Sequence, residues 1–124
     1  MREAIGAEPK LWVDFNATLS PGFAVAFLKK MEKFCIAIAE QPVLPSNLDG
    51  MAYVRNSVSS QILAHESSWT LYETLNVIAK GAADIISVDP RMTWGLMACK
   101  KAAAVAEAAG MPVLMHSAAE LGIA

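Results

Sequence analysis

Cysteine is scarce in this sequence, and charged residues are fewer than usual. Cys35 and Cys99 stand alone, one in a strand-like run and one in a helix-like run, which excludes a disulfide framework and a cysteine metal site. We therefore expect a protein of the reducing cytoplasm, with both cysteines free and buried. The net charge of −2 gives no sign of a broad surface for nucleic acid or for a membrane.

Long apolar runs and glycine-rich loops are also missing. Lys, Glu or Asp interrupts every uncharged stretch before about 18 residues, so no transmembrane span is predicted. Residues 1–6 contain no apolar core of the signal-peptide kind. Gly81 and Gly110 are typical helix stops rather than parts of a G-x-G-x-x-G loop. The alternative of an unrelated parallel α/β binding module therefore has no phosphate loop to support it.

Short apolar runs and helical patterns alternate along the whole chain. The apolar runs lack polar alternation, as expected of strands that are buried on both faces. They lie at residues 11–13, 35–39, 61–64, 84–88 and 112–115. Helices are predicted at about 20–33, 48–56, 69–80 and 95–109, and residues 1–6 resemble the end of another helix. This order predicts an α/β protein with parallel strands and crossover helices.

Each predicted strand ends in an ionisable residue. These residues are Asp14, Glu40, Glu66, Asp89 and His116, at spacings of 26, 26, 23 and 27 residues. One strand, one helix and two short loops need about this length, so the five groups occupy equivalent places in successive βα units. In a closed barrel all five would point into one mouth, whereas a doubly wound sheet would spread them along an edge. We therefore predict part of a (β/α)8 TIM barrel with five parallel strands.

Asp14, Glu40 and Glu66 form a candidate metal site. Taken singly, Asp14 could be a turn residue and Glu40 a solvated loop charge. Their even spacing favours a shared site, where three carboxylates would repel one another and resist ionising together. A hard divalent cation relieves that repulsion, and oxygen ligands select Mg²⁺ or Mn²⁺ over zinc.

Asp89 and His116 follow on the next two predicted strands and form a candidate catalytic pair. A carboxylate that faces a histidine fixes its tautomer and raises its basicity, which makes the histidine a credible proton acceptor. Together with a metal, such a pair could remove the proton alpha to a substrate carboxylate and hold the resulting enediolate.

Five strand-end motifs carry a resemblance to a known family. They are Val13-Asp14-Phe15-Asn16, Ala39-Glu40-Gln41-Pro42, His65-Glu66-Ser67, Val88-Asp89-Pro90 and Gly110-Met111-Pro112-Val113-Leu114-Met115-His116-Ser117. They resemble the successive strand-end motifs of the mandelate racemase and muconate-lactonizing family of the enolase superfamily. The resemblance covers essentially the whole chain.

The resemblance implies roles for individual residues. Asp14, Glu40 and Glu66 would bind Mg²⁺, and Asp89 and His116 would form the His–Asp pair of the mandelate racemase branch. The muconate-lactonizing and dipeptide-epimerase branch fits less well, because it places a lysine at the end of the sixth strand. No lysine lies between positions 80 and 100.

The resemblance also implies that part of the family's architecture is absent. Residues 1–124 match about strands three to seven of the C-terminal barrel domain, whereas a complete barrel needs about 250 residues. The N-terminal capping domain and the strand with the Lys-x-Lys motif have no counterpart here. The family usually has Gly-Gly after the sixth strand, where this sequence has Trp94-Gly95.

Other residues near these strand ends are candidates for lining or supporting the site. Asn16 and Trp94 are possible substrate-pocket residues, with a loop cap and simple packing as the alternatives. His65 would point away from Glu66 if the strand continued, and we expect it to be structural or to support the ligands. Asp84 starts a strand, at the end of the barrel that serves stability, and is not expected to be catalytic.

Two functional hypotheses remain open. In the first, the protein is a Mg²⁺-dependent racemase, epimerase or acid-sugar dehydratase, commonly homo-oligomeric in this family, that acts on a small carboxylate such as a hydroxy acid or sugar acid. In the second, the chain is a truncated, non-catalytic barrel fragment with exposed strand edges. The substrate and the choice between racemase and dehydratase cannot be predicted from the sequence.

Overall fold

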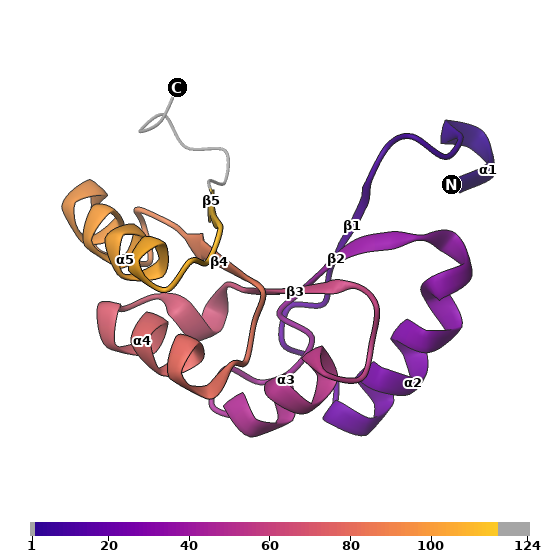
Figure 1. Ribbon diagram of the computed structural model, residues 1–124, viewed down its shortest axis with the longest axis horizontal. Helices are drawn as coiled ribbons and strands as arrows, with labels where there is room; N and C mark the ends of the chain where they lie inside the picture. Colours follow the sequence, from indigo (N-terminus) through magenta and orange to yellow (C-terminus); the bar gives the residue numbers. More distant parts are fainter. Residues whose placement is uncertain (1, 117–124) are drawn as a thin grey trace.

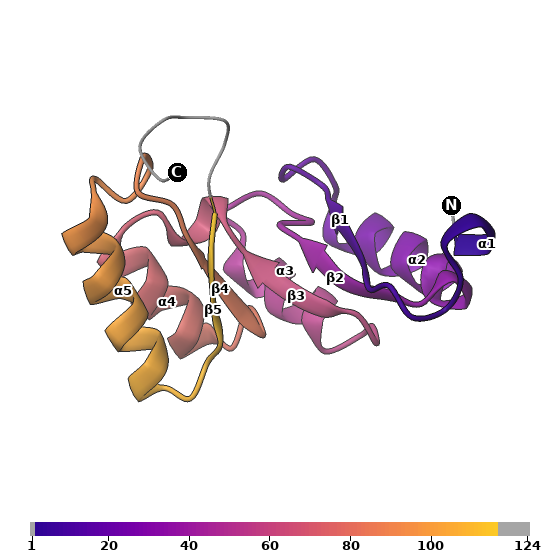
Figure 2. The ribbon, with the colours of Figure 1, turned by 90° about the horizontal axis from the view of Figure 1, so that it is seen from above.

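Five parallel strands form one sheet in chain order, β1-β2-β3-β4-β5. The computed structural model describes residues 2–116. The strands are β1 Leu11–Asp14, β2 Ile36–Glu40, β3 Gln61–Ala64, β4 Ile85–Val88 and β5 Val113–Met115. Figure 2 shows the strands side by side, and Figure 1 shows the sheet curling into part of a barrel. The predicted partial (β/α) barrel is confirmed.

A helical segment connects each strand to the next. The helices are α1 Arg2–Ile5, α2 Pro21–Met31, α3 Leu48–Arg55, α4 Leu71–Lys80 and α5 Leu96–Ala108, with short 3₁₀ turns η1 Glu32–Phe34 and η2 Glu66–Ser68. Local signals fix their ends. Thr70 and Glu73 form a reciprocal capping box at the start of α4, and Gly81 ends that helix with φ +59°. Within residues 2–116, no helix has the length and apolar character needed to cross a membrane.

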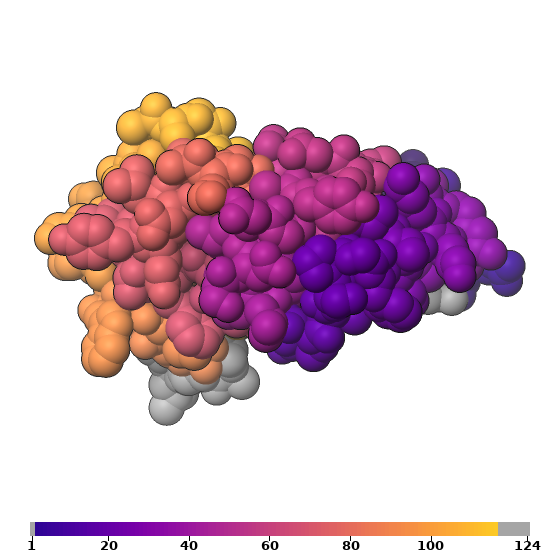
Figure 3. Space-filling model, turned by 90° about the horizontal axis from the view of Figure 1, so that it is seen from below, coloured from indigo at the N-terminus to yellow at the C-terminus, as the bar shows by residue number. Residues whose placement is uncertain are grey.

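The hydrophobic core lies between the convex face of the sheet and helices α2 to α5. The outward-facing strand residues Ala39, Ile62, Ala64, Ile86 and Val88 pack there against buried helix residues. The helix residues include Ala24, Leu28, Met51, Val54, Val77, Cys99, Ala102 and Ala106. In Figure 3 the colours run in chain order along the molecule, so each βα unit packs beside its neighbours.

The register of the strands decides which residues face the inside of the curl. Asp14 pairs with Glu40, and Glu40 pairs with Leu63, so these three side chains share a face. Because Ala39 and Ile62 belong to the outer core, Asp14, Glu40 and Leu63 must face inward. The sequence pattern alone did not distinguish the two faces, since both are apolar.

Cys35 departs from its prediction. It precedes β2 instead of lying in it, has φ +52° after η1, and is exposed. The prediction that both cysteines are buried is therefore wrong for Cys35 and confirmed for Cys99. The cause is the end of α2, which tightens into a 3₁₀ turn and closes on a left-handed residue before the strand begins.

Asp84 ties together the end of the sheet opposite to the strand ends that carry Glu40 and Asp89. Its Oδ1 accepts a hydrogen bond from Arg55 Nε at 2.7 Å, and its Oδ2 accepts one from the backbone N–H of Ile62 at 2.8 Å. Arg55 also donates to the carbonyl of Gly81 at 3.2 Å. The carboxylate therefore joins α3, the start of β3 and the end of α4.

Replacing Asp84 should lower stability without affecting the opposite edge. We expect Asp84→Ala to reduce the free energy of unfolding by about 1.5–3 kcal/mol, because it removes charge-assisted hydrogen bonds to partly buried donors. The matched control is Asp49→Ala, which removes an exposed ion pair to Lys80 and should cost under about 1 kcal/mol. Urea unfolding measures both, and equal losses would contradict the structural role of Asp84.

Candidate active site at the carboxyl ends of the strands

All five predicted strand-end residues lie at one edge of the sheet. Asp14 and Glu40 are the last residues of β1 and β2, while Glu66, Asp89 and His116 each follow a strand closely. Parallel strands present their carboxyl ends at the same edge, so the curl of the sheet gathers these groups. The predicted convergence is therefore present in the fold.

Glu40 is the most buried carboxylate of the first two strands. Its side chain is 4% exposed, and its Oε2 accepts a hydrogen bond from the indole Nε1 of Trp12 at 2.8 Å. Among the described residues, its Oε1 has no hydrogen-bond partner. Asp14 is exposed, and its Oδ1 accepts a hydrogen bond from the backbone N–H of Asn16 at 2.8 Å. Glu40 thus keeps one buried oxygen without a hydrogen bond in the described part of the chain, although Nδ1 of His65 lies 3.2 Å from it.

His65 reaches the site, although strict alternation along the strand predicted that it would point away from Glu66, and its contacts agree with the predicted supporting role. Its Nδ1 lies 3.2 Å from Oε1 of Glu40 and 3.6 Å from Oε2 of Glu66, and its Nε2 lies 3.8 Å from Oδ2 of Asp89. The strand ends at Ala64, and η2 begins at Glu66. His65 is two residues beyond the inward-facing Leu63, so it keeps the inward direction, while the turn brings Glu66 to the same region.

Charges at this edge shift the pKa values of two neighbouring groups. Burial raises the pKa of Glu66, and the nearby charges of Asp14 and Glu40 raise it further, against the opposing effect of His65. Burial lowers the pKa of His65, but its contact with Glu40 and the charges of Glu40, Glu66 and Asp89 outweigh that effect and raise it. The carboxylates of β1, β2 and η2 are thus close enough for their charges to act on one another.

Asp89 and His116 form the predicted pair. The Nδ1 of His116 lies 3.0 Å from Oδ2 of Asp89, whose side chain is fully buried. Arg91 donates to the same carboxylate through its backbone N–H at 2.9 Å and its Nη2 at 2.8 Å. Burial alone would raise the pKa of Asp89, but the bonds from Arg91 and His116 lower it to about 2. Asp89 is therefore ionised near neutral pH and orients the imidazole.

The two histidine rings lie against each other at the centre of the site. Their centroids are 4.3 Å apart and the planes are inclined by 32°. One potential ligand atom from each of Glu40, His65 and His116 lies within 4.8 Å of the others. This set shares only Glu40 with the predicted group of Asp14, Glu40 and Glu66, whose role in metal binding stays a prediction.

The two predicted pocket residues lie in loops at the same edge. Asn16 is exposed, with φ +47°, directly after β1. Trp94 is 87% exposed with φ +68°, and Gly95 follows with φ +103° as the N-cap of α5. Both residues thus have positive φ values, which are strained for Trp94 because of its Cβ atom and are readily adopted by Gly95. Contact of Asn16 or Trp94 with a substrate stays a prediction.

The sequence profile of the enolase C-terminal domain-like family matches residues 1–124. The chain belongs to this family. The chain is 31% identical over 120 residues to a hydrophobic dipeptide epimerase of Enterococcus faecalis, covering 97% of this chain and 34% of the relative. It is 28% identical to an arabinonate dehydratase of Saccharolobus solfataricus over 119 residues, covering 96% of this chain and 32% of the relative.

A solved structure agrees with the family assignment. An enolase from Bradyrhizobium, solved with magnesium and mandelic acid, superposes with a TM-score of 0.87 at 31% identity, covering 93% of this chain and 32% of that one. The chain thus spans about a third of the length of the curated relatives it matches. These relatives include a dipeptide epimerase, so overall identity does not separate the two branches that the sequence motifs distinguished.

Gln41 holds the loop that carries the site, a role that sequence reasoning missed. Gln41 is fully buried. Its Oε1 accepts hydrogen bonds from the backbone N–H of His65 at 3.0 Å and from the N–H and Oγ of Ser67 at 3.1 and 2.9 Å. Its Nε2 donates to the carbonyl of Val43 at 2.9 Å. The signal available in the sequence was a glutamine directly after a strand-end glutamate. In the structure this glutamine has φ +35°.

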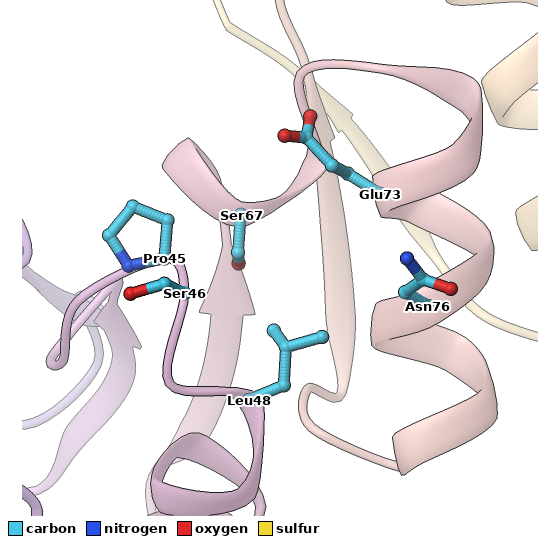
Figure 4. A pocket seen from close by; sticks show the side chains of 6 residues that line it. All are labelled: Pro45, Ser46, Leu48, Ser67, Glu73 and Asn76. Atoms are coloured by element: carbon cyan, nitrogen blue, oxygen red, sulfur yellow. The ribbon is translucent and has the colours of Figure 1, made fainter.

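A separate hollow lies on the helix side of this loop. Figure 4 shows it between residues 45–48 and α4, lined by Pro45, Ser46, Leu48, Ser67, Glu73 and Asn76. None of the five predicted site residues lines it. Glu73 is engaged there as the capping residue of α4, with its Oε2 accepting from the N–H of Thr70 at 2.8 Å. The hollow is therefore a feature of helix packing beside the candidate site.

Removing the amide of Gln41 should loosen the His65–Glu66 segment. We expect Gln41→Leu to lower the free energy of unfolding by at least about 2 kcal/mol, because buried donors lose their acceptor. Ser67→Ala removes one of these bonds and should cost about 1 kcal/mol. Urea unfolding gives the stability, and amide hydrogen exchange at His65 and Ser67 gives the local effect. Unchanged exchange in a folded Gln41→Leu variant would contradict this role.

Proposed function

We propose that the protein containing this chain removes the proton alpha to the carboxylate of a small substrate, as a racemase, epimerase or acid-sugar dehydratase. The observation that carries the proposal is the contact of 3.0 Å between His116 and the buried, ionised Asp89, beside a group of carboxylates. Membership of the enolase C-terminal domain-like family supports the same reaction class. A hydroxy acid, a sugar acid or a dipeptide would fit the class of substrate.

His116 serves as the base in this proposal. In this role Nδ1–H of His116 donates a hydrogen bond to Asp89 and keeps its proton, which leaves the lone pair of Nε2 free to take the alpha proton. The Arg91 bonds keep Asp89 ionised, so its charge stabilises the imidazolium that forms. In an epimerase a second acid, on the opposite face of the substrate from His116, delivers a proton to the same carbon atom and so inverts its configuration. In a dehydratase the protonated histidine instead supplies the proton with which a β-hydroxyl leaves as water.

The carboxylates of the site fit a divalent cation. Oε1 of Glu40 and Oε2 of Glu66 are buried and lack hydrogen-bond partners among residues 2–116, and the charges around Glu66 raise its pKa. We propose that Asp14, Glu40 and Glu66 hold Mg²⁺, the ion that hard oxygen ligands prefer. When bound, Mg²⁺ supplies positive charge that stabilises the negative charge developing on the substrate carboxylate.

Catalytic turnover requires the barrel strands outside these 124 residues. The chain spans about a third of its curated relatives, so we propose catalysis for the complete barrel and metal binding without turnover for the 124 residues alone. We also propose a homo-oligomer in the cytoplasm as the working form of the complete protein, in keeping with the family resemblance. Residues 1–124 would form part of the C-terminal barrel domain, with the other barrel strands and the capping domain supplied from outside them.

Loss of one carboxylate should abolish magnesium binding. We expect Glu40→Gln to lower the Mg²⁺ affinity of the chain by at least about tenfold, because an amide neither carries charge nor coordinates hard cations as strongly. Calorimetric titration measures the affinity, and Asp49→Asn, an exposed acidic change outside the site, is the control. Equal affinity of folded Glu40→Gln and wild type would contradict the proposed metal site.

Loss of the base should abolish proton exchange. In the complete protein we expect His116→Asn to slow exchange of the substrate alpha proton into D₂O by about 10²- to 10⁴-fold. Proton NMR follows the loss of the alpha-proton signal over a panel of hydroxy acids, sugar acids and dipeptides. The exposed helix variant Lys101→Gln is the control. Exchange at the wild-type rate in the His116 variant would place the base elsewhere.

A further inference from the structure

The chain contains two histidines, and both lie in the candidate active site. His65 and His116 come from different βα units, yet their ring centroids are 4.3 Å apart. The proposed reaction uses His116 and gives His65 no task. An 11%-exposed imidazole placed between two carboxylates and a second imidazole therefore needs its own explanation.

Glu40, His65 and His116 present ligand atoms to a common point. One ligand atom from each residue lies within 4.8 Å of the other two. Independently, Nε2 of His65 is buried and has no hydrogen-bond partner among the described residues. Oε1 of Glu40 is also buried and makes no hydrogen bond there, although Nδ1 of His65 lies 3.2 Å from it. Burying polar atoms without hydrogen bonds is unfavourable, so their occurrence in the same group of residues indicates a ligand that they bind.

The hydrogen bond of His116 is the kind that orients a metal-binding imidazole. Its Nδ1 lies 3.0 Å from Oδ2 of Asp89, which leaves Nε2 as the atom that faces a ligand. Histidines that bind metals usually donate their second N–H to a carboxylate or a carbonyl, which fixes the ring and strengthens the ligand. Arg91 in turn donates a hydrogen bond to Asp89, so the contact of Arg91 with Asp89 and that of Asp89 with His116 together orient the imidazole.

We propose that Glu40, His65 and His116 bind a borderline first-row transition ion such as Zn²⁺, Co²⁺ or Ni²⁺ more tightly than Mg²⁺. Two imidazoles and one carboxylate suit these ions, whereas Mg²⁺ prefers oxygen ligands and binds imidazole poorly. The ion carries two positive charges into a site where Glu66 and Asp89 add negative charge nearby. The remaining coordination positions are open to water or substrate.

This site overlaps the proposed magnesium site and has a regulatory consequence. Both ligand sets contain Glu40, so the two ions exclude each other. A transition ion also occupies the lone pair that His116 needs as a base. The transition ion therefore inhibits proton transfer, and Mg²⁺ at high concentration relieves the inhibition. This regulatory consequence, unlike the binding of the ion, rests on the proposed function.

Two variants separate this site from the magnesium site. We expect His65→Gln to lower the Co²⁺ affinity of the chelator-treated chain by at least about tenfold and to remove its visible ligand-field absorption, while its calorimetric Mg²⁺ affinity stays within about threefold. Asp14→Asn should show the reverse pattern. Circular dichroism confirms that each variant is folded.

The wild-type chain gives a second test that needs no variant. With two histidines, a long-range ¹H–¹⁵N spectrum contains two imidazole spin systems. Zn²⁺ should shift both of them at one equivalent, and Mg²⁺ should leave their nitrogen shifts nearly unchanged.

The outcomes distinguish the two proposals. A folded His65→Gln chain that binds Co²⁺ as tightly as wild type, or Zn²⁺ shifts at one histidine alone, would overturn the transition-ion site. Failure of Mg²⁺ to bind while Co²⁺ binding depends on His65 would overturn the magnesium proposal and leave this one standing.

Discussion

Repulsion between carboxylates at one edge of the sheet is the interaction around which the site is organised. Two like charges about 4 Å apart repel by about 1 kcal/mol in water and about 4 kcal/mol near a protein surface. Asp14, Glu40, Glu66 and Asp89 all end in this region because parallel strands place their carboxyl ends together. Each carboxylate must therefore find a positive partner, hold a proton or bind a cation.

The two halves of the site meet this repulsion in different ways. On the β4 side the chain itself supplies the compensation, since Arg91 and His116 lower the pKa of Asp89 to about 2. On the β2 side the compensation is incomplete: Oε1 of Glu40 has Nδ1 of His65 nearby but makes no hydrogen bond within residues 2–116, and the pKa of Glu66 is raised. The first half is ready to orient a base, and the second half is ready to receive a cation. His65 lies where the halves meet.

The sequence predicted the fold well because the fold depends on a repeated local pattern. Apolar runs, helix caps and glycine stops gave all five strands and the helices between them, and the even spacing gave the common edge. The directions of individual side chains were harder to predict. His65 keeps the inward direction of β3, and the 3₁₀ turn Glu66–Ser68 that follows it brings Glu66 to the same region, which strict alternation from Glu66 could not show. Counting two residues onward from the inward-facing Leu63 gives the direction of His65, but that count needs the register with Glu40.

Gln41 and Asp84 show why contacts between units escape sequence reasoning. The amide of Gln41 reaches from the end of β2 to the loop after β3, and Asp84 reaches from the start of β4 to α3 and β3. Neither role can be predicted from the local sequence, because each side chain satisfies backbone groups of a neighbouring βα unit. The two lie at opposite ends of the sheet, so Asp84 can stabilise the fold without touching the ligands. Gln41 cannot be separated from the site in this way, since the buried oxygen that satisfies the backbone of His65 also fixes where that imidazole points. Stability and ligand geometry are thus independent at the amino ends of the strands and coupled at their carboxyl ends.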